Sequence, residues 1–255
     1  LKATENGIEY TLDESMLKGN LLKGGRLVMG DSVFFRYSGL IKGAVKEYNF
    51  VDGWWLGQRF SLSMPFTKTS RLSVIPWAYY VTGRKTVNWN AEVKLNYLPL
   101  SNGLFSVSGG SSSADMQGDK GTGRDRNAYA SFLRGNNVIR FYKSNSIKVT
   151  NSIDIANGLI LSLGAGYENR MLLSNSTTFH LWGNEPRPNV PDDVYAASFP
   201  RHTATTAWIG LTYTPFMHYR IVKGKKLSAG SDYPTFNALY QTAFRMSDKS
   251  EQSDY

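Results

Sequence analysis

The clearest indication of the fold is the segment Asn88-Trp89-Asn90-Ala91-Glu92-Val93-Lys94-Leu95-Asn96-Tyr97. Apolar and polar residues alternate along it without exception, so an extended strand has one apolar face and one wholly polar face. Trp89 and Tyr97 end the apolar face, eight residues apart. That separation is roughly 26 Å along a strand. For a strand tilted by ~40° in a membrane barrel, it corresponds to about 20 Å along the membrane normal. This height is close to the ~25 Å apolar band of membrane β-barrels.

The same period of two predicts further strands on both sides of this stretch. The clearest are 54–66, 147–155, 159–167, 207–213 and 236–244. Weaker candidates are 31–39, 71–81, which Pro76 interrupts, and 103–112. Only 127–143 is compatible with a short helix, and its sequence leaves the choice open. The patterns together predict an all-β fold: an antiparallel meander of about eight strands over 53–245, preceded by one more at 31–39.

The connections between these strands alternate between short and long, with few exceptions. Residues 67–70, 99–102 and 156–158 are short, and the last contains Asn157-Gly158, a strong hairpin signal because both residues tolerate a positive φ. Residues 113–144 and 170–200 are far longer than hairpin loops usually are. Such alternation is typical of an outer-membrane barrel, with short periplasmic turns and long extracellular loops. We therefore expect 113–144 and 170–200 to lie outside the cell.

Composition narrows the class of protein. The 255 residues include no Cys and only three His, which excludes disulfide scaffolds and thiolate zinc sites and makes a histidine metal cluster improbable on numbers alone. No run reaches the ~18 apolar residues of a membrane helix. The net charge is +9, but Lys and Arg are scattered rather than clustered, which argues against a nucleic-acid partner. No metal or cofactor is expected.

Strand alternation also assigns faces. Side chains that we expect in the lipid-facing aromatic belts are Trp54, Phe66, Trp89, Tyr97, Tyr167, Tyr213, Phe236 and Phe244. Side chains that we expect to face the lumen are Arg59, Glu92, Lys94, Asn96, Asn237 and Arg245. The alternative is that the aromatic residues form the core of a soluble barrel or sandwich. The polar faces suit a watery lumen better than a second solvent-exposed face.

Strand parity bears on domain organisation. If 67–70 is periplasmic, the ninth predicted strand, at 235–245, runs outward and ends outside the cell. Bacterial barrels usually have an even number of strands and both chain ends in the periplasm. The polar stretch 247–255 does not suit a returning strand. We therefore expect a transmembrane barrel that is incomplete in this chain, with 1–30 as a periplasmic or linker segment and 31–255 as part of the wall.

Several short motifs occur in an order seen in one family. They are Tyr48-Asn49-Phe50-Val51-Asp52-Gly53, Asn96-Tyr97-Leu98-Pro99-Leu100 with Gly103, Ile155-Ala156-Asn157-Gly158-Leu159, Ser198-Phe199-Pro200-Arg201-His202, and Asp232-Tyr233-Pro234-Thr235-Phe236 with Tyr240. On these motifs the chain resembles the large outer-membrane barrels of unassigned function whose full-length members carry an N-terminal carboxypeptidase regulatory-like domain. The resemblance covers about 30–245, implies a place in the outer membrane of a Gram-negative envelope, and supplies no catalytic residues. Asp52 departs from the pattern, in which Glu is usual.

Three groups of residues have side chains that could take part in binding or catalysis. The run 118–124 superficially suggests a phosphate loop, but it lacks the order Gly-Lys-Ser/Thr and a strand-to-helix setting, which favours a surface loop. Glu185, Asp192 and Asp193 are oxygen ligands that suit calcium, yet their spacing is irregular. Ser198 and His202 have the residue types of a nucleophile and base, but no third orienting group stands at a readable spacing.

We therefore expect a non-enzymatic outer-membrane β-barrel protein, acting in transport or as a subunit of an envelope assembly, with its substrate open. Its expected partners are outer-membrane lipid and other envelope proteins or the missing part of the same barrel. Two alternatives stay open: an outer-membrane barrel enzyme acting on lipid or peptide, and a soluble lipid-binding β-barrel. His202 or His180 beside an acidic and a hydroxyl group would favour the enzyme.

Overall fold

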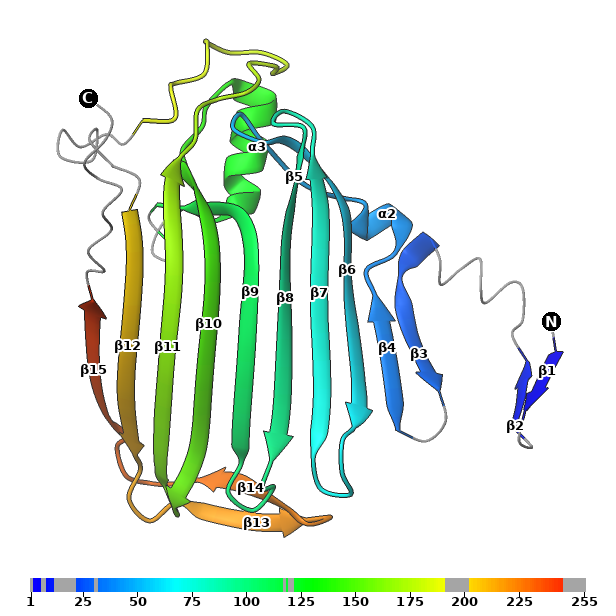
Figure 1. The fold of residues 1–255 in the computed structure, drawn as a ribbon, viewed down its shortest axis with the longest axis vertical. Helices are drawn as coiled ribbons and strands as arrows, with labels where there is room; N and C mark the ends of the chain where they lie inside the picture. Colours follow the sequence, from blue (N-terminus) through cyan, green and yellow to red (C-terminus); the bar gives the residue numbers. More distant parts are fainter. Residues whose placement is uncertain are drawn as a thin grey trace.

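The computed structural model describes residues 2–5, 8–11, 22–29, 32–116, 118, 122–190 and 202–244. Most of them form one antiparallel sheet of eleven strands (Figure 1). Its strands are β3 (Gly25–Met29), β4 (Val33–Tyr37), β5 (Val45–Asn49), β6 (Gly53–Pro65), β7 (Arg71–Val81), β8 (Thr86–Tyr97), β9 (Gly103–Asp115), β10 (Phe141–Ala156), β11 (Leu159–Leu172), β12 (His202–Tyr213) and β15 (Phe236–Phe244).

The strand order is that of a meander. From one edge it reads β15-β12-β11-β10-β9-β8-β7-β6-β4-β3, and β5 pairs with β6 beside β4. Each strand predicted from the period of two is present, which confirms the all-β antiparallel meander. The predicted turn at Asn157-Gly158 joins β10 to β11, and Gly158 has a φ of 75° there.

Two short strands near the N-terminal side of the sheet, β3 and β5, were not predicted. β4 pairs with the later part of β6, and β5 pairs with its first part, so that the two strands share one edge. The short helix α2 (Leu40–Gly43) lies between them. β3 pairs with β4 and begins at Gly25, six residues before the predicted start of the wall at 31. Five-residue strands are too short to show a clear period, which explains why β3 and β5 escaped notice.

Pro76 does not break β7. The strand continues through it and pairs Pro76 with Ala91 of β8. On the β6 side, the register has no pair between Arg59 opposite Trp77 and Leu62 opposite Val74. Proline has no N–H to donate, so the ladder is interrupted on one side only.

The undecided region contains a helix and then a strand. Helix α3 (Arg124–Arg134) ends at Gly135, whose φ of 67° is the left-handed conformation common after a helix. β9 extends to Asp115 and β10 begins at Phe141, so the connection between them is shorter than the predicted 113–144. In Figure 1, α3 lies at one end of the sheet. We call this the capped end.

Two further hairpins lie outside the large sheet. β1 (Lys2–Glu5) pairs with β2 (Ile8–Thr11), within the segment predicted as a linker. β13 (His218–Val222) pairs with β14 (Lys225–Gly230), between the predicted strands 207–213 and 236–244. This second hairpin crosses the end of the sheet opposite α3 (Figure 1). Lys226 Nζ holds it there through an ion pair of 3.0 Å with Asp154 of β10.

Buried apolar side chains gather at the capped end. Within the described part of the chain they are Tyr48, Phe50, Val51, Trp55, Tyr79, Val81, Ile139 and Phe141. Six of them form two clusters: Trp55 with Tyr79 and Val81, and Val51 with Ile139 and Phe141. Among the described residues, the long middle of the sheet contributes no buried apolar cluster. No helix in the described ranges is long and apolar enough to cross a membrane.

Candidate functional site

One face of the sheet is apolar and open. Directly opposed residues point to the same face of a sheet, and the register aligns Val93 with Val74 and Val107 on the neighbouring strands. The exposed large apolar side chains of this face are Leu56, Phe60, Tyr80, Val87, Trp89, Val93, Phe105, Ile147, Val149, Leu163, Tyr167, Ile209, Leu211, Tyr213, Phe236, Tyr240 and Phe244. Over β6–β12 and β15, the charged residues that the register places on this face are Asp115 and Lys143, both next to the capped end.

Two polar residues on this face are accounted for by local hydrogen bonds. Gln58 Nε2 donates to the carbonyl of Gly39 at 2.8 Å, just before α2. The hydroxyl of Tyr97 donates to Asn151 Oδ1 at 2.7 Å across the sheet. These bonds satisfy the amide nitrogen of Gln58 and the hydroxyl of Tyr97, whereas Gln58 Oε1 is buried without a partner among the described residues.

The predicted belt residues share this face, but they differ in how exposed they are. Five of them are exposed on it: Trp89, Tyr167, Tyr213, Phe236 and Phe244. Phe66 follows β6 and is 63% exposed, whereas Tyr97 is half-buried. Trp54 is covered, because its ring packs 5.0 Å from Phe132 of α3 and 4.9 Å from Tyr48. Contact with lipid stays a prediction for the whole set.

The predicted lumen residues share the opposite face. The register places Arg59, Glu92, Lys94, Asn96 and Asn237 there. Lys94 Nζ pairs with Glu92 Oε2 at 3.0 Å, with both side chains about one-third exposed. Arg245 lies outside the described residues. That this face lines a lumen stays a prediction.

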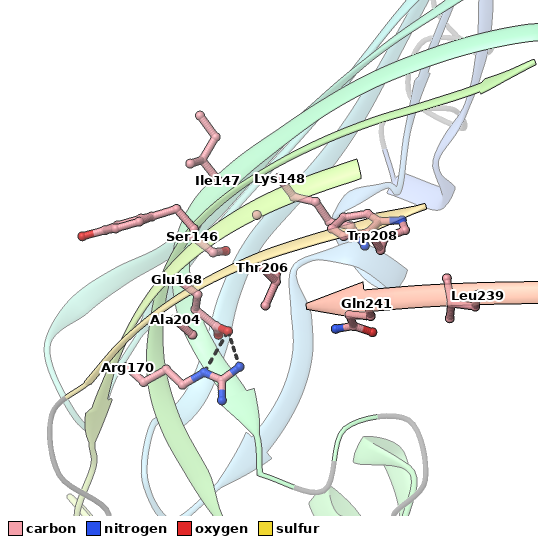
Figure 2. A pocket seen from close by; sticks show the side chains of 12 residues that line it. Ser146, Ile147, Lys148, Glu168, Arg170, Ala204, Thr206, Trp208, Leu239 and Gln241 are labelled. Atoms are coloured by element: carbon pink, nitrogen blue, oxygen red, sulfur yellow. Dashed lines mark hydrogen bonds and ion pairs between the residues drawn. The ribbon is translucent and has the colours of Figure 1, made fainter. Parts of the chain in front are cut away.

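A groove lies on the polar face over β11, and sequence reasoning did not identify it. Figure 2 shows its walls: Ser146 and Lys148 on β10, Thr206 and Trp208 on β12, and Gln241 on β15. Its volume is about 530 Å³, within the usual range of small-molecule sites. We call it the β11 groove.

Gly166 lies on the floor of the β11 groove, and Gly164, two residues before it on β11, lies under the Trp208 ring. A Cβ on Gly164 would lie 1.9 Å from Cζ2 of Trp208, so the indole lies across a backbone that has no side chain. A Cβ on Gly166 would approach Thr206 Oγ1 only to 3.3 Å. Glycine within a strand often marks such a close approach, and this alternation was the signal available in the sequence. Lys148 Nζ lies 4.9 Å from the Trp208 ring centroid.

Glu168 lies at one end of the groove, and both oxygens of its carboxylate accept hydrogen bonds. Glu168 Oε2 accepts hydrogen bonds from Nε and Nη2 of Arg170 at 2.8 and 2.6 Å. Its Oε1 accepts bonds from the hydroxyls of Tyr142 at 2.9 Å and Ser144 at 2.6 Å. Glu168 therefore has its charge balanced and its orientation fixed before any ligand arrives.

The motif Tyr48–Gly53 forms the turn between β5 and β6 and buries a carboxylate at the capped end. Oδ1 of Asp52 accepts hydrogen bonds from Arg84 Nε at 2.6 Å and Ser113 Oγ at 2.9 Å. Oδ2 accepts one from Trp55 Nε1 at 3.0 Å. These partners come from three separate parts of the chain, so one buried acid joins the ends of neighbouring hairpins.

A second ion pair attaches α3 to this end of the sheet. The guanidinium of Arg124 pairs with the buried carboxylate of Glu47 on β5, and Arg124 Nη1 donates to the carbonyl of Ser113 at 3.0 Å. Burial by itself would lower the pKa of Arg124, but the hydrogen bonds and charge of Glu47, with added attraction from Asp52 and Asp115, raise it. Arg124 is therefore charged at any physiological pH.

The described part of the predicted long loop, 173–190, packs onto the capped end. Ser176 Oγ donates to the carbonyl of Val51 at 2.6 Å. Asn189 accepts from the Phe141 N–H at 2.8 Å and donates to its carbonyl at 2.7 Å. This segment lies against α3 in Figure 1 and forms with it a cap over the strand ends.

Of the remaining candidates, Glu185 and His180 lie within the described residues. Glu185 is exposed on the cap, and His180 Nδ1 lies 2.7 Å from the carbonyl of Thr178. Asp192, Asp193 and Ser198 lie outside the described residues, and the side chain of His202 is likewise not described. Within the described residues, no group of three or more His, Asp or Glu is placed to hold a metal ion.

Comparison with known proteins gives one match. A family model described as the C-terminal domain of a family of unknown function, DUF5686, matches residues 19–255. Searches among curated proteins and solved structures found no similar chain.

Proposed function

The chain belongs to the DUF5686 family through its C-terminal domain, and we propose that it is a non-enzymatic outer-membrane β-barrel protein that acts in transport or as a subunit of an envelope assembly. The family's function is unknown, so the proposal rests on the two faces of the sheet. The single observation that carries it is the open apolar face.

The apolar face is too extensive to be left in water. Its exposed side chains extend over successive strands from β6 to β15, whereas soluble monomers rarely expose contiguous apolar patches of more than a few hundred Å². Lipid acyl chains suit this face because its charged residues are confined to the capped end. Aromatic residues at both ends of β8, Trp89 and Tyr97, match the girdles of membrane barrels.

The opposite face supports the same proposal. It carries serine, asparagine, lysine and arginine along the same strands, as a water-filled lumen requires. We propose that further strands, from the same protein or a partner, continue the sheet at β3 and β15, because edge strands in lipid would leave main-chain groups without partners. The resemblance noted above adds an N-terminal carboxypeptidase regulatory-like domain to the full-length protein, also as a proposal.

Fractionation tests the location. The native protein should stay in the outer-membrane fraction of a Gram-negative cell after a carbonate wash and should need detergent for release. Recovery in the aqueous fraction without detergent would overturn the proposal and favour the soluble lipid-binding barrel. Partners that co-purify in mild detergent would then separate an assembly subunit from a transporter that acts alone.

A further inference from the structure

We propose that the β11 groove binds a small hydroxylated organic anion of the class of sugar phosphates and uronic acids. The inference deepens the proposed function, on which it rests in one respect: the polar face must be open to water in the assembled protein. Three features of the groove support it, namely its charge, its free hydrogen-bonding groups and its apolar wall.

The charge of the groove is positive. Glu168 is balanced by Arg170 and has hydrogen bonds on both oxygens. Lys148 is exposed, and within the described residues its contact is with the Trp208 ring rather than with a carboxylate. A net cation therefore remains in the groove, and a carboxylate or phosphate is the group that complements it.

The neutral side chains suit hydroxyl groups. Ser146, Thr206 and Gln241 line the groove, and among the residues described none of their side chains makes a hydrogen bond with the protein. Serine, threonine and glutamine each both donate and accept, as a sugar hydroxyl does. A bare inorganic anion mainly accepts hydrogen bonds, whereas sugar hydroxyls also donate to the acceptor oxygens of these side chains.

The apolar wall is the indole of Trp208, held in place across Gly164. Aromatic rings of this kind supply a large rigid contact area for the C–H groups of a ligand. The floor at Gly166 leaves a trough between Lys148 and Thr206, which lie on the strands flanking β11. A volume of about 530 Å³ accommodates a sugar with its charged substituent.

The test is binding to the full chain in detergent, measured by calorimetry. Probes are glucose 6-phosphate, galacturonate, glucose and inorganic phosphate. We expect both sugar anions to bind about 10-fold or more tightly than glucose or phosphate. Glucose lacks the charged group that Lys148 would bind, and inorganic phosphate lacks the sugar ring that would contact Trp208. Equal affinity for phosphate and glucose 6-phosphate would reduce the groove to a general anion site and overturn the proposal.

Variants locate the binding. Lys148→Gln should weaken the sugar anions about 10-fold, and Gly166→Val, which fills the floor without changing charge, should also weaken them. Lys94→Gln, the control, removes the same charge from the same face outside the groove and should leave binding unchanged. An equal loss in Lys94→Gln would show a diffuse field rather than a site. Membrane insertion without binding refutes only the groove, whereas binding by a protein found in the aqueous fraction refutes only the proposed function.

Discussion

Nε of Arg84 lies 2.6 Å from Oδ1 of Asp52, and Asp52 is fully buried while Arg84 is 14% exposed. The pair joins the turn before β6 to the turn after β7, and Ser113 of β9 donates to the same carboxylate. Because the apolar core of the described residues is confined to this end, the ion pair lies where the cap and the sheet are held together.

Asp52→Asn should destabilise the protein by about 3–5 kcal/mol, because it leaves the buried guanidinium of Arg84 without a counter-charge. Urea unfolding of the chain refolded in lipid vesicles measures the change. Glu92→Gln is the control, since the Glu92–Lys94 pair is partly exposed and should contribute at most about 1 kcal/mol. Equal losses of unfolding free energy in the two variants would show that the Asp52–Arg84 pair contributes no more than an exposed ion pair.

Val93→Arg should cost ~2–4 kcal/mol in refolding into lipid vesicles, because it places a charge near the middle of the proposed lipid-facing band. Lys94→Arg, on the adjacent residue and the opposite face, keeps its charge and should cost almost nothing. If both variants refold equally well, Val93 does not face lipid, and the soluble lipid-binding β-barrel becomes the favoured alternative.

Gly164→Ala should cost about 1–3 kcal/mol and change the tryptophan emission, because the new methyl would lie 1.9 Å from the Trp208 ring and force it to move. Gly166→Ala, two residues away on the same face, meets only Thr206 Oγ1 at 3.3 Å and should cost less than about 1 kcal/mol. Unfolding midpoints and fluorescence of the two variants give the comparison. A Gly164→Ala variant with unchanged emission would contradict the placement of the indole over β11.

The two ends of the sheet should differ in access from outside the cell. The 255-residue chain has no cysteine, so a single introduced one gives a defined label within it. Trp182→Cys, on the cap at an exposed position, should react with a membrane-impermeant maleimide in intact cells. Lys68→Cys, in the short turn between β6 and β7, should react only after the outer membrane is broken. The reverse pattern would invert the topology.

Much of the fold was predictable because its signals are local. A strand's alternation depends on the two-residue period of the backbone, so Trp89 to Tyr97 assigns the faces of β8 without knowledge of its neighbours. Asn157-Gly158 likewise encodes its own turn, since the positive φ at Gly158 is a property of that residue. The hairpin β13–β14 was missed because its position depends on a distant partner, Asp154 for Lys226.

Alternation along single strands is enough to predict the meander and to separate an apolar face from a polar one. The contacts between side chains of different strands came from the three-dimensional structure: Lys148 beside Trp208, Trp208 over Gly164, and Arg84 against Asp52. A face follows from spacing along one strand, whereas a site follows from register between strands. Register depends on every intervening turn and bulge, and no single stretch of sequence specifies it.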